Sequence, residues 1–91
     1  MTISKEITLI NKYGMHVRPA GALAKVCQKY MSEVSVANSG TAVSGKSVLG
    51  LMTLEAPVGT VLTITAEGDD ANLVMDEIEE LIGNRFGIAD E

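Results

Sequence analysis

The stretch Gly14-Met15-His16-Val17-Arg18-Pro19-Ala20 marks the point at which the chain changes from strand to helix. Before it, residues 2 to 10 alternate polar and apolar side chains, which predicts a half-buried strand. After it, apolar residues recur at three- and four-residue spacing through residues 17 to 30, which predicts an amphipathic helix. Pro19 falls in the first turn of that helix, where its missing N–H costs no hydrogen bond. The pattern therefore places His16, the one histidine of the chain, at a helix N-terminus.

The rest of the chain continues this alternation of strands and helices. It predicts strands at residues 33 to 38 and 41 to 44, a short helix capped by Ser47, a strand at 60 to 67, a helix at 70 to 82 capped by Asp70, and an irregular tail at 84 to 91. The order is β-α-β-β-α-β-α, and ninety-one residues suffice for a single domain, residues 1-91. We therefore expect a two-layer α+β domain in which three helices lie on one face of an antiparallel sheet.

Charge and cysteine content narrow the classes of function. The chain has a net charge of −5, but up to Lys46 it carries six basic residues against two acidic ones, and from Ser47 onward ten acidic residues against one basic. A basic half that contains the histidine suits an anionic group or acidic partners. There is no basic run and there are few aromatic residues, which argues against nucleic-acid binding. Cys27 is the one cysteine, in a helical apolar pattern, and we expect it to be a small buried side chain.

His16 is a candidate for phosphate chemistry because of where it falls. A lone histidine is more often structural, but this one precedes a helix and follows a glycine loop. A helix N-terminus offers free backbone N–H groups and the positive end of the helix dipole, both of which suit a phosphate. Arg18 adds a cation that can pair with phosphate oxygens. We expect Gly14, Val17 and Pro19 to form the loop that supports the phosphate.

Other kinds of site fit the sequence less well. A zinc site needs three or four ligands, and His16 has no second histidine and only one cysteine to join it, so we expect no metal. No G-x-S-x-G nucleophile elbow is present. Gly40-x-x-x-x-Gly45-Lys46-Ser47 fits the nucleotide-binding loop pattern, but it follows a predicted hairpin and the chain is too short for a nucleotide fold.

The helix that follows Ser47 carries more apolar side chains than one buried stripe requires. These residues, among them Val48, Leu49 and Met52, form either an ordinary helix buried on two sides or a partly exposed docking patch. Both interpretations remain open from the residue pattern. Gly21, in the preceding helix, either allows close packing or keeps space open beside the histidine.

Three blocks of the sequence resemble the histidine-containing phosphocarrier protein (HPr) family of the bacterial phosphotransferase system. Gly14–Ala20 looks like the active-site signature of that family, Gly45–Met52 resembles its serine-centred motif, and Gly59–Gly68 resembles its fourth strand. The blocks occur in the order and spacing of the family and cover essentially the whole chain. The resemblance implies an open-faced β-sandwich with strand order 1-4-2-3.

The resemblance also implies a function and its residues. His16 would accept phosphate at Nδ1 from enzyme I, which draws on phosphoenolpyruvate, and pass it to enzyme IIA proteins, with Arg18 assisting. Ser47 resembles the serine modified by HPr kinase/phosphorylase in some bacteria. The implied docking residues are Ala20, Gly21, Val48, Leu49 and Met52. The protein would be a carrier and not an enzyme, and would need no cofactor.

Two roles are compatible with this resemblance. One is sugar transport through the phosphotransferase system; the other is a regulatory protein of the nitrogen-related branch, which acts mainly by phosphorylation-dependent partner binding. His16 serves both, so the residues do not separate them. The N-terminus shows no signal peptide and no stretch approaches the roughly 20 apolar residues of a membrane span. We therefore expect a cytoplasmic protein without membrane insertion, a monomer with transient partners.

Overall fold

The computed structural model describes residues 1 to 90, and Glu91 lies outside the described residues. The elements are β1 (Thr2–Thr8), α1 (Val17–Gln28), β2 (Glu33–Asn38), β3 (Thr41–Ser44), α2 (Val48–Thr53), β4 (Val61–Glu67), α3 (Ala71–Gly83) and a 3-10 turn, η1 (Arg85–Gly87). The predicted order β-α-β-β-α-β-α is confirmed. The first strand ends two residues earlier than predicted, although Leu9 still exchanges backbone hydrogen bonds with Thr60 and Gly59 (2.9 and 2.8 Å).

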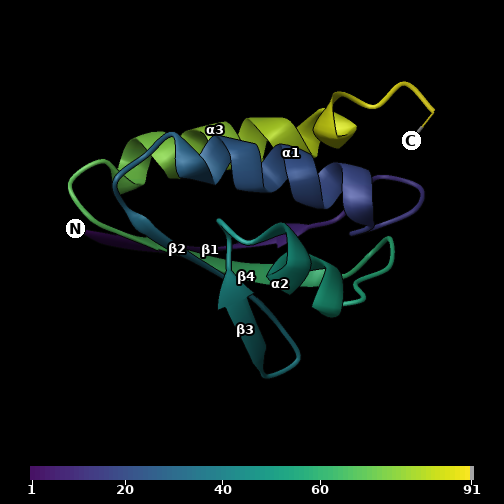
Figure 1. The fold of residues 1–91 in the computed structure, drawn as a ribbon, viewed down its shortest axis with the longest axis horizontal. Coiled ribbons are helices and arrows are strands. Elements are labelled where there is room, and N and C mark those ends of the chain that lie inside the picture. Colours follow the sequence, from purple (N-terminus) through teal and green to yellow (C-terminus); the bar gives the residue numbers. More distant parts are fainter. Residues whose placement is uncertain (91) are drawn as a thin grey trace.

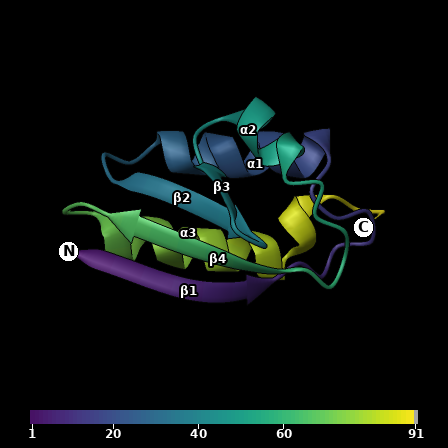
Figure 2. The same ribbon diagram turned by 90° about the horizontal axis from the view of Figure 1, so that it is seen from below.

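The four strands form one antiparallel sheet in the order β1-β4-β2-β3. Figure 1 shows α1 and α3 side by side over one face of the sheet, and Figure 2 looks onto the opposite face, which these two helices leave uncovered. The short helix α2 packs against α1 and β3 at the β3 side of the sheet (Figure 2). This is the α+β open-faced sandwich with strand order 1-4-2-3 that the sequence and the family resemblance predicted.

The core lies between the sheet and the two long helices. Alternate residues of β4, namely Leu62, Ile64 and Ala66, are fully buried, whereas Val61 and Thr63 are exposed and Thr65 is half-buried. Such alternation is expected when only one face of a sheet is covered. The stripes of α1 and α3 close over these strands, and the fully buried side chains of the two helices include Leu23, Cys27, Val74 and Ile78.

Cys27 is buried, as predicted from the helical pattern. Burial raises the pKa of the Cys27 thiol to about 11, so the thiol stays protonated at neutral pH. A protonated thiol within the core is a poor nucleophile and a poor metal ligand. Cys27 is therefore a packing residue.

The chain after α3 is more ordered than predicted. We expected an irregular tail from Asn84 to Glu91, but the turn η1 folds back so that Phe86 is only 5% exposed and packs into the core. Arg85 and Phe86 have φ values of 52° and 59°, a left-handed conformation that reverses the chain direction. Burial of the Phe86 ring offsets the cost of that backbone conformation. The part of the prediction that concerns Glu91 lies outside the described residues.

Asp70 occupies the N-cap position of α3, but its side chain makes no capping hydrogen bond, so this part of the prediction is wrong. The carboxylate instead accepts hydrogen bonds from the backbone N–H of Met31 (2.9 Å) and of Ser32 (2.9 Å), and from the Ser32 hydroxyl. It thereby joins the start of α3 to the connection between α1 and β2. These hydrogen bonds, with that of the Ser32 hydroxyl foremost, lower the pKa of the Asp70 carboxyl.

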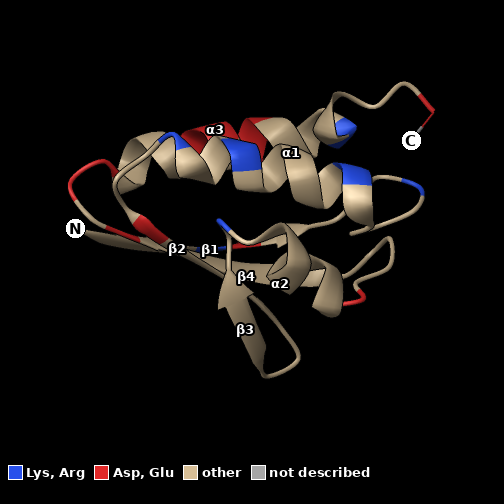
Figure 3. Cartoon of the chain, in the orientation of Figure 1, with Lys and Arg blue, Asp and Glu red and all other residues tan. Residues whose placement is uncertain are grey.

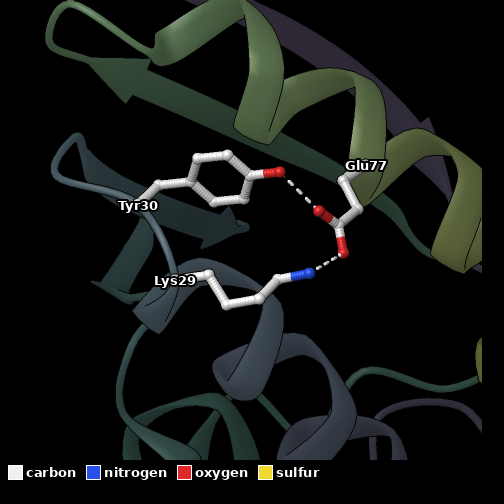
Figure 4. A network of polar contacts seen from close by, with 3 residues as sticks. All are labelled: Lys29, Tyr30 and Glu77. Atoms are coloured by element: carbon white, nitrogen blue, oxygen red, sulfur yellow. Dashed lines mark hydrogen bonds and ion pairs between the residues drawn. The ribbon is translucent and has the colours of Figure 1, made fainter.

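A second polar contact joins the two long helices directly. Glu77 of α3 accepts hydrogen bonds from the Lys29 ammonium and the Tyr30 hydroxyl at the end of α1 (Figure 4). The bond from Lys29 and then that from Tyr30 lower the pKa of the Glu77 carboxyl. Figure 3 shows the wider pattern, in which α3 carries the acidic residues and α1 the basic ones. Through Glu77, the acidic second half of the sequence pairs with Lys29 of the basic first half.

We predict that Asp70→Asn destabilises the protein in a pH-dependent way. Because the pKa of the Asp70 carboxyl is lowered from 3.8 in the folded protein, its carboxylate stabilises the fold above that pH, and this stability is lost as the pH falls through the lowered value. Urea unfolding should therefore show a less stable variant at pH 7 and a shrinking difference from the wild type below pH 4. Asp69→Asn is the control, because Asp69 is exposed. A difference of equal size at pH 3 and pH 7 would contradict the prediction.

Candidate functional site

His16 is the N-cap residue of α1, as the sequence predicted. Its backbone is extended (φ −106°, ψ −168°), and its carbonyl accepts the first hydrogen bond of the helix, from the N–H of Ala20 at 2.9 Å. The residue is half-buried.

The N-terminus of α1 is suited to an anion. The His16 side chain makes no capping hydrogen bond to the helix, and the first turn contains no acidic residue. The first hydrogen bond of the helix is donated by Ala20, so the backbone N–H groups of Val17 and Arg18 have no partner carbonyl within the helix. Pro19 has no backbone N–H. The positive end of the helix dipole therefore lies at His16, and no acidic side chain in the first turn offsets it.

The loop before His16 is fixed by a close backbone approach at Gly14. Gly14 has φ +65°, and a Cβ there would lie 2.3 Å from the carbonyl oxygen of Ala56 and 2.8 Å from the Cα of Pro57. The next residue, Met15, donates its N–H to the same Ala56 carbonyl at 2.8 Å and is 4% exposed. Only glycine fits this position, where a positive φ and the absence of a Cβ allow a close contact with the chain after α2.

Asn11 belongs to the same loop and was not identified from the sequence. Asn11 is fully buried, and its side-chain Nδ2 donates a hydrogen bond to the backbone carbonyl of Gly14 at 2.7 Å. The backbone carbonyl of Asn11 in turn accepts from the N–H of Gly14 at 3.2 Å. These two bonds close the turn that delivers His16. The sequence signal for this turn is an asparagine three residues before a glycine, a common pairing in turns. That pairing does not distinguish a buried asparagine side chain from an exposed one.

Arg18 projects from the first turn of α1 into solvent. Its side chain is 63% exposed, and Nη1 lies 3.9 Å from Oδ1 of Asp90, itself 75% exposed. An ion pair this long and this exposed contributes little to stability. The guanidinium is therefore available to exchange Asp90 for another anion.

Tyr13 and Lys12 lie close to the histidine, and neither stands out as a site residue in the sequence. The Tyr13 and His16 rings make an edge-to-face contact with centroids 6.2 Å apart and planes at 84°. The Lys12 ammonium lies 5.1 Å from the centroid of the Tyr13 ring. A single aromatic residue in a polar loop is not a distinctive pattern, so this contact could not have been read from the residue types alone.

Ser47 is the N-cap of α2, as predicted. Its Oγ accepts a hydrogen bond from the N–H of Gly50 at 3.0 Å, and its carbonyl accepts from the N–H of Leu51 at 3.0 Å. The residue is half-buried. The preceding Lys46 is held by a bond from its Nζ to the carbonyl of Tyr30 (3.0 Å), so the start of α2 is tied to the end of α1.

The apolar side chains of α2 divide between core and surface. Leu51 is fully buried, whereas Val48, Leu49 and Met52 are 36%, 75% and 38% exposed. We refer to these three exposed residues as the α2 patch. Its exposure favours the docking interpretation of this helix over that of a helix buried on two sides.

Two small residues of α1 were expected to extend that docking surface. Gly21 is half-buried, and an added Cβ would meet no heavy atom within 4 Å, so the space above it is open. Ala20 is fully buried, and its inclusion in the docking surface must be corrected. Its side chain belongs to the stripe that α1 turns toward the core, and α2 covers the same helix.

Neither a metal site nor a membrane span is found over residues 1 to 90. Within this range, no three or more histidine, cysteine, aspartate or glutamate side chains gather closely enough to hold a metal ion. None of the helices described is both long and apolar enough to cross a bilayer.

The fold and site together define a small α+β domain with a histidine at the N-terminus of α1, whose first turn has no acidic residue, and with exposed apolar side chains on α2, which packs against α1. The family model described as "PTS HPr component phosphorylation site" matches residues 3–84. The phosphocarrier protein HPr of Borreliella burgdorferi is 41% identical over 88% of this chain and 93% of its own, and that of Cupriavidus necator is 35% identical over 93% and 96%. The chain belongs to the HPr phosphocarrier family of the phosphotransferase system.

Solved structures agree with this assignment. A crystal structure of HPr from Thermoanaerobacter tengcongensis, 32% identical, superposes with a TM-score of 0.90 over 94% of this chain and 97% of that one. An HPr dimer from the same organism, 34% identical, gives 0.77 over 90% and 94%. Proteins of this family carry phosphate and are not enzymes in their own right, and some of them form dimers.

We predict that Gly14→Ala destabilises the protein by about 1–3 kcal/mol, because the added Cβ strains a positive φ and meets the Ala56 carbonyl. Gly21→Ala is the matched control. It lies within α1 in open space, and should raise the free energy of unfolding by about 0.5–1 kcal/mol. Chemical denaturation of both variants measures the difference. Equal stability of the two variants would contradict the close approach at Gly14.

Proposed function

We propose that this protein carries a phosphoryl group on His16, accepting it from enzyme I and passing it to enzyme IIA proteins. The observation that carries the proposal is the position of His16 as the half-buried N-cap of α1, with no acidic residue in the first turn. Membership of the HPr family supports it, since the matched family model is named for a phosphorylation site and spans His16.

The accepting atom in this proposal is Nδ1 of His16. Nδ1 is bonded to Cγ and therefore lies nearer to the backbone than Nε2 does. A phosphoryl group on it comes within reach of the N–H groups of Val17 and Arg18 at the start of α1. The group then supplies the negative charge that the first turn of the helix lacks.

The transfer step balances without a further reactant. The unprotonated Nδ1 of a neutral imidazole attacks phosphorus with its lone pair, the N–P bond forms, and the bond from phosphorus to the donor atom of the partner breaks. The electron pair of that bond returns to the donor, and the proton on Nε2 of His16 stays in place. Onward transfer to the next partner repeats the step in the opposite sense.

Arg18 assists by pairing with phosphate oxygens. It exchanges the long contact with Asp90 (3.9 Å) for a charge-assisted hydrogen bond to the phosphoryl group. Because the contact with Asp90 is exposed and weak, the exchange costs little. The planar guanidinium can contact two oxygens at once, which a lysine cannot do with the same geometry.

The α2 patch and the open space over Gly21 form the surface on which partners dock. A partner that covers Val48, Leu49 and Met52 removes apolar area from water, which supplies affinity. Lys12 and Arg18 near the histidine steer acidic partner surfaces toward it. The acidic residues gathered on α3 (Figure 3) repel such surfaces and so favour approach from the side of His16.

Ser47 is the proposed site of regulation by HPr kinase/phosphorylase. Its Oγ now accepts from the N–H of Gly50. A phosphate there stays compatible with the helix N-terminus but adds negative charge next to the α2 patch, so acidic partners bind less tightly. Incubation with ATP and an HPr kinase should label the wild type and leave Ser47→Ala unlabelled.

The branch of the system served by the protein is decided by its partners. Sugar transport is the main proposal because the curated relatives are named phosphocarrier protein HPr, and a regulatory role of the nitrogen-related type is the alternative. We further propose that the protein works in the cytoplasm as a monomer. Reconstitution with the two types of enzyme I, and then with sugar transporters, separates these two roles. Phosphorylation of His16 that does not lead to sugar transport indicates the regulatory role.

We predict that phosphoenolpyruvate and enzyme I label the protein with one acid-labile phosphate, and that His16→Ala takes up none. A phosphoramidate on imidazole is labile in acid, unlike a phosphate on a hydroxyl, so acid treatment followed by mass spectrometry identifies the linkage. Ser47→Ala is the control and should label as the wild type does. An acid-stable phosphate, or normal labelling of His16→Ala, refutes the carrier proposal.

We also predict that Leu49→Asp weakens transfer by raising the KM for enzyme I about 10-fold or more, because a charge is placed in the apolar contact. Its free energy of unfolding should change by less than about 0.5 kcal/mol, since Leu49 is 75% exposed. Leu73→Asp is the matched control, an exposed leucine of α3 (55%) outside the α2 patch, and should leave the KM unchanged. Equal effects of the two substitutions would remove α2 from the docking surface.

A further inference from the structure

Tyr13 contacts the histidine from the preceding loop. The Tyr13 and His16 ring centroids are 6.2 Å apart and the ring planes are inclined at 84°. At this separation an edge-to-face pair is attractive, because the positive edge of one ring meets the negative face of the other. The contact therefore favours a particular orientation of the imidazole and not merely its proximity.

The backbone that carries Tyr13 is held on both sides. Asn11, which is buried, donates from Nδ2 to the carbonyl of Gly14 (2.7 Å), and Met15 donates its N–H to the carbonyl of Ala56 (2.8 Å). The Lys12 ammonium lies 5.1 Å from the centroid of the Tyr13 ring, within the range of a cation–π contact. The Tyr13 ring is thus presented to His16 by a turn that is hydrogen-bonded on both sides.

The fold does not account for an aromatic residue at this position. Tyr13 is 58% exposed, so the core does not depend on it. The torsion that turns a histidine ring is broad and roughly two-fold, and a 180° turn exchanges the places of the two ring carbons and nitrogens. A neighbour that makes an edge-to-face contact restricts the plane of the imidazole, and the lone pair of the unprotonated nitrogen lies in that plane.

We propose that Tyr13 is a positioning residue for His16: its edge-to-face contact holds the plane of the imidazole, and with it the direction in which the lone pair of the accepting nitrogen meets the phosphoryl donor. This inference rests on the proposed function for its effect on transfer, but the orientation itself is a property of the free protein. Tyr13 acts through His16 and does not contact the reacting phosphorus.

The first test measures the ring orientation without any phosphate. His16 is the one histidine of the chain, so its imidazole resonances can be assigned directly in ¹H–¹⁵N and ¹H–¹³C NMR spectra. Tyr13→Leu removes the aromatic ring and should shift the His16 ring-proton resonances and the nuclear Overhauser contacts of the imidazole. Tyr13→Phe keeps the ring and should retain the wild-type pattern.

The second test measures transfer with enzyme I and phosphoenolpyruvate. Tyr13→Leu should lower the kcat of His16 labelling about 10-fold with the KM for enzyme I unchanged, because a misplaced nucleophile slows the step without weakening docking. Tyr13→Phe should restore the wild-type kcat. Urea unfolding of both variants should match the wild type, since Tyr13 is exposed.

The outcomes separate this inference from the proposed function. Unchanged His16 resonances in Tyr13→Leu overturn the positioning role, whatever the rate. A raised KM with an unchanged kcat also overturns it and makes Tyr13 a docking residue. If the wild type takes up no phosphate, the proposed function fails, while the NMR comparison still decides whether Tyr13 sets the orientation of the imidazole.

Discussion

The site depends on one backbone contact, the approach of Gly14 and Met15 to the carbonyl of Ala56. The Met15 N–H donates to that carbonyl at 2.8 Å, and Gly14 lies so close to it that no Cβ fits between. This contact fixes where α1 begins and hence where His16 stands. It also joins the histidine loop to the segment that follows α2, and so adds to the direct packing of α2 on α1 and to the Lys46 hydrogen bond at the start of α2. His16 and the α2 patch are therefore held in one frame at both ends of α2.

The two helix N-termini of this region are used in opposite ways. At α2, the Ser47 hydroxyl fills the cap position and accepts from the N–H of Gly50, so the helix is closed by its own side chain. At α1, the cap residue is His16, whose side chain makes no such bond. Leaving this terminus without a side-chain cap gives up about 1 kcal/mol of helix stability. The core between the sheet and the long helices, together with the Glu77 and Asp70 contacts, holds α1 in place without it.

The sequence predicted the fold well because binary patterning carries most of the information in a two-layer domain. Alternation in residues 60 to 67 and helical spacing in residues 17 to 30 each predict an element and the face it buries, and both are confirmed. Predictions based on short polar signals were less reliable. Asp70 has the residue type of a cap, but the N–H groups of Met31 and Ser32 compete for its carboxylate. Phe86 lies in a polar tail, and only the tertiary fold offers its ring a place to be buried. Asn11 and Tyr13 act through contacts across a turn, which residue types do not specify.

A carrier must hold its group firmly enough to keep it from water and weakly enough to give it up. Each interaction of a phosphate with the N-terminus of α1 would contribute about 0.3–1 kcal/mol, and Arg18, which is 63% exposed and only weakly paired with Asp90, would add a contact that is easily given up. None of these groups encloses the His16 side chain, which is half-buried and open on the side that faces solvent. Water exclusion during transfer must then come from the partner, and the α2 patch provides the apolar contact that such a partner needs. Under the proposed function, the exposure of Leu49 has a use: it supplies apolar surface through which a partner would cover the open site and exclude water during transfer.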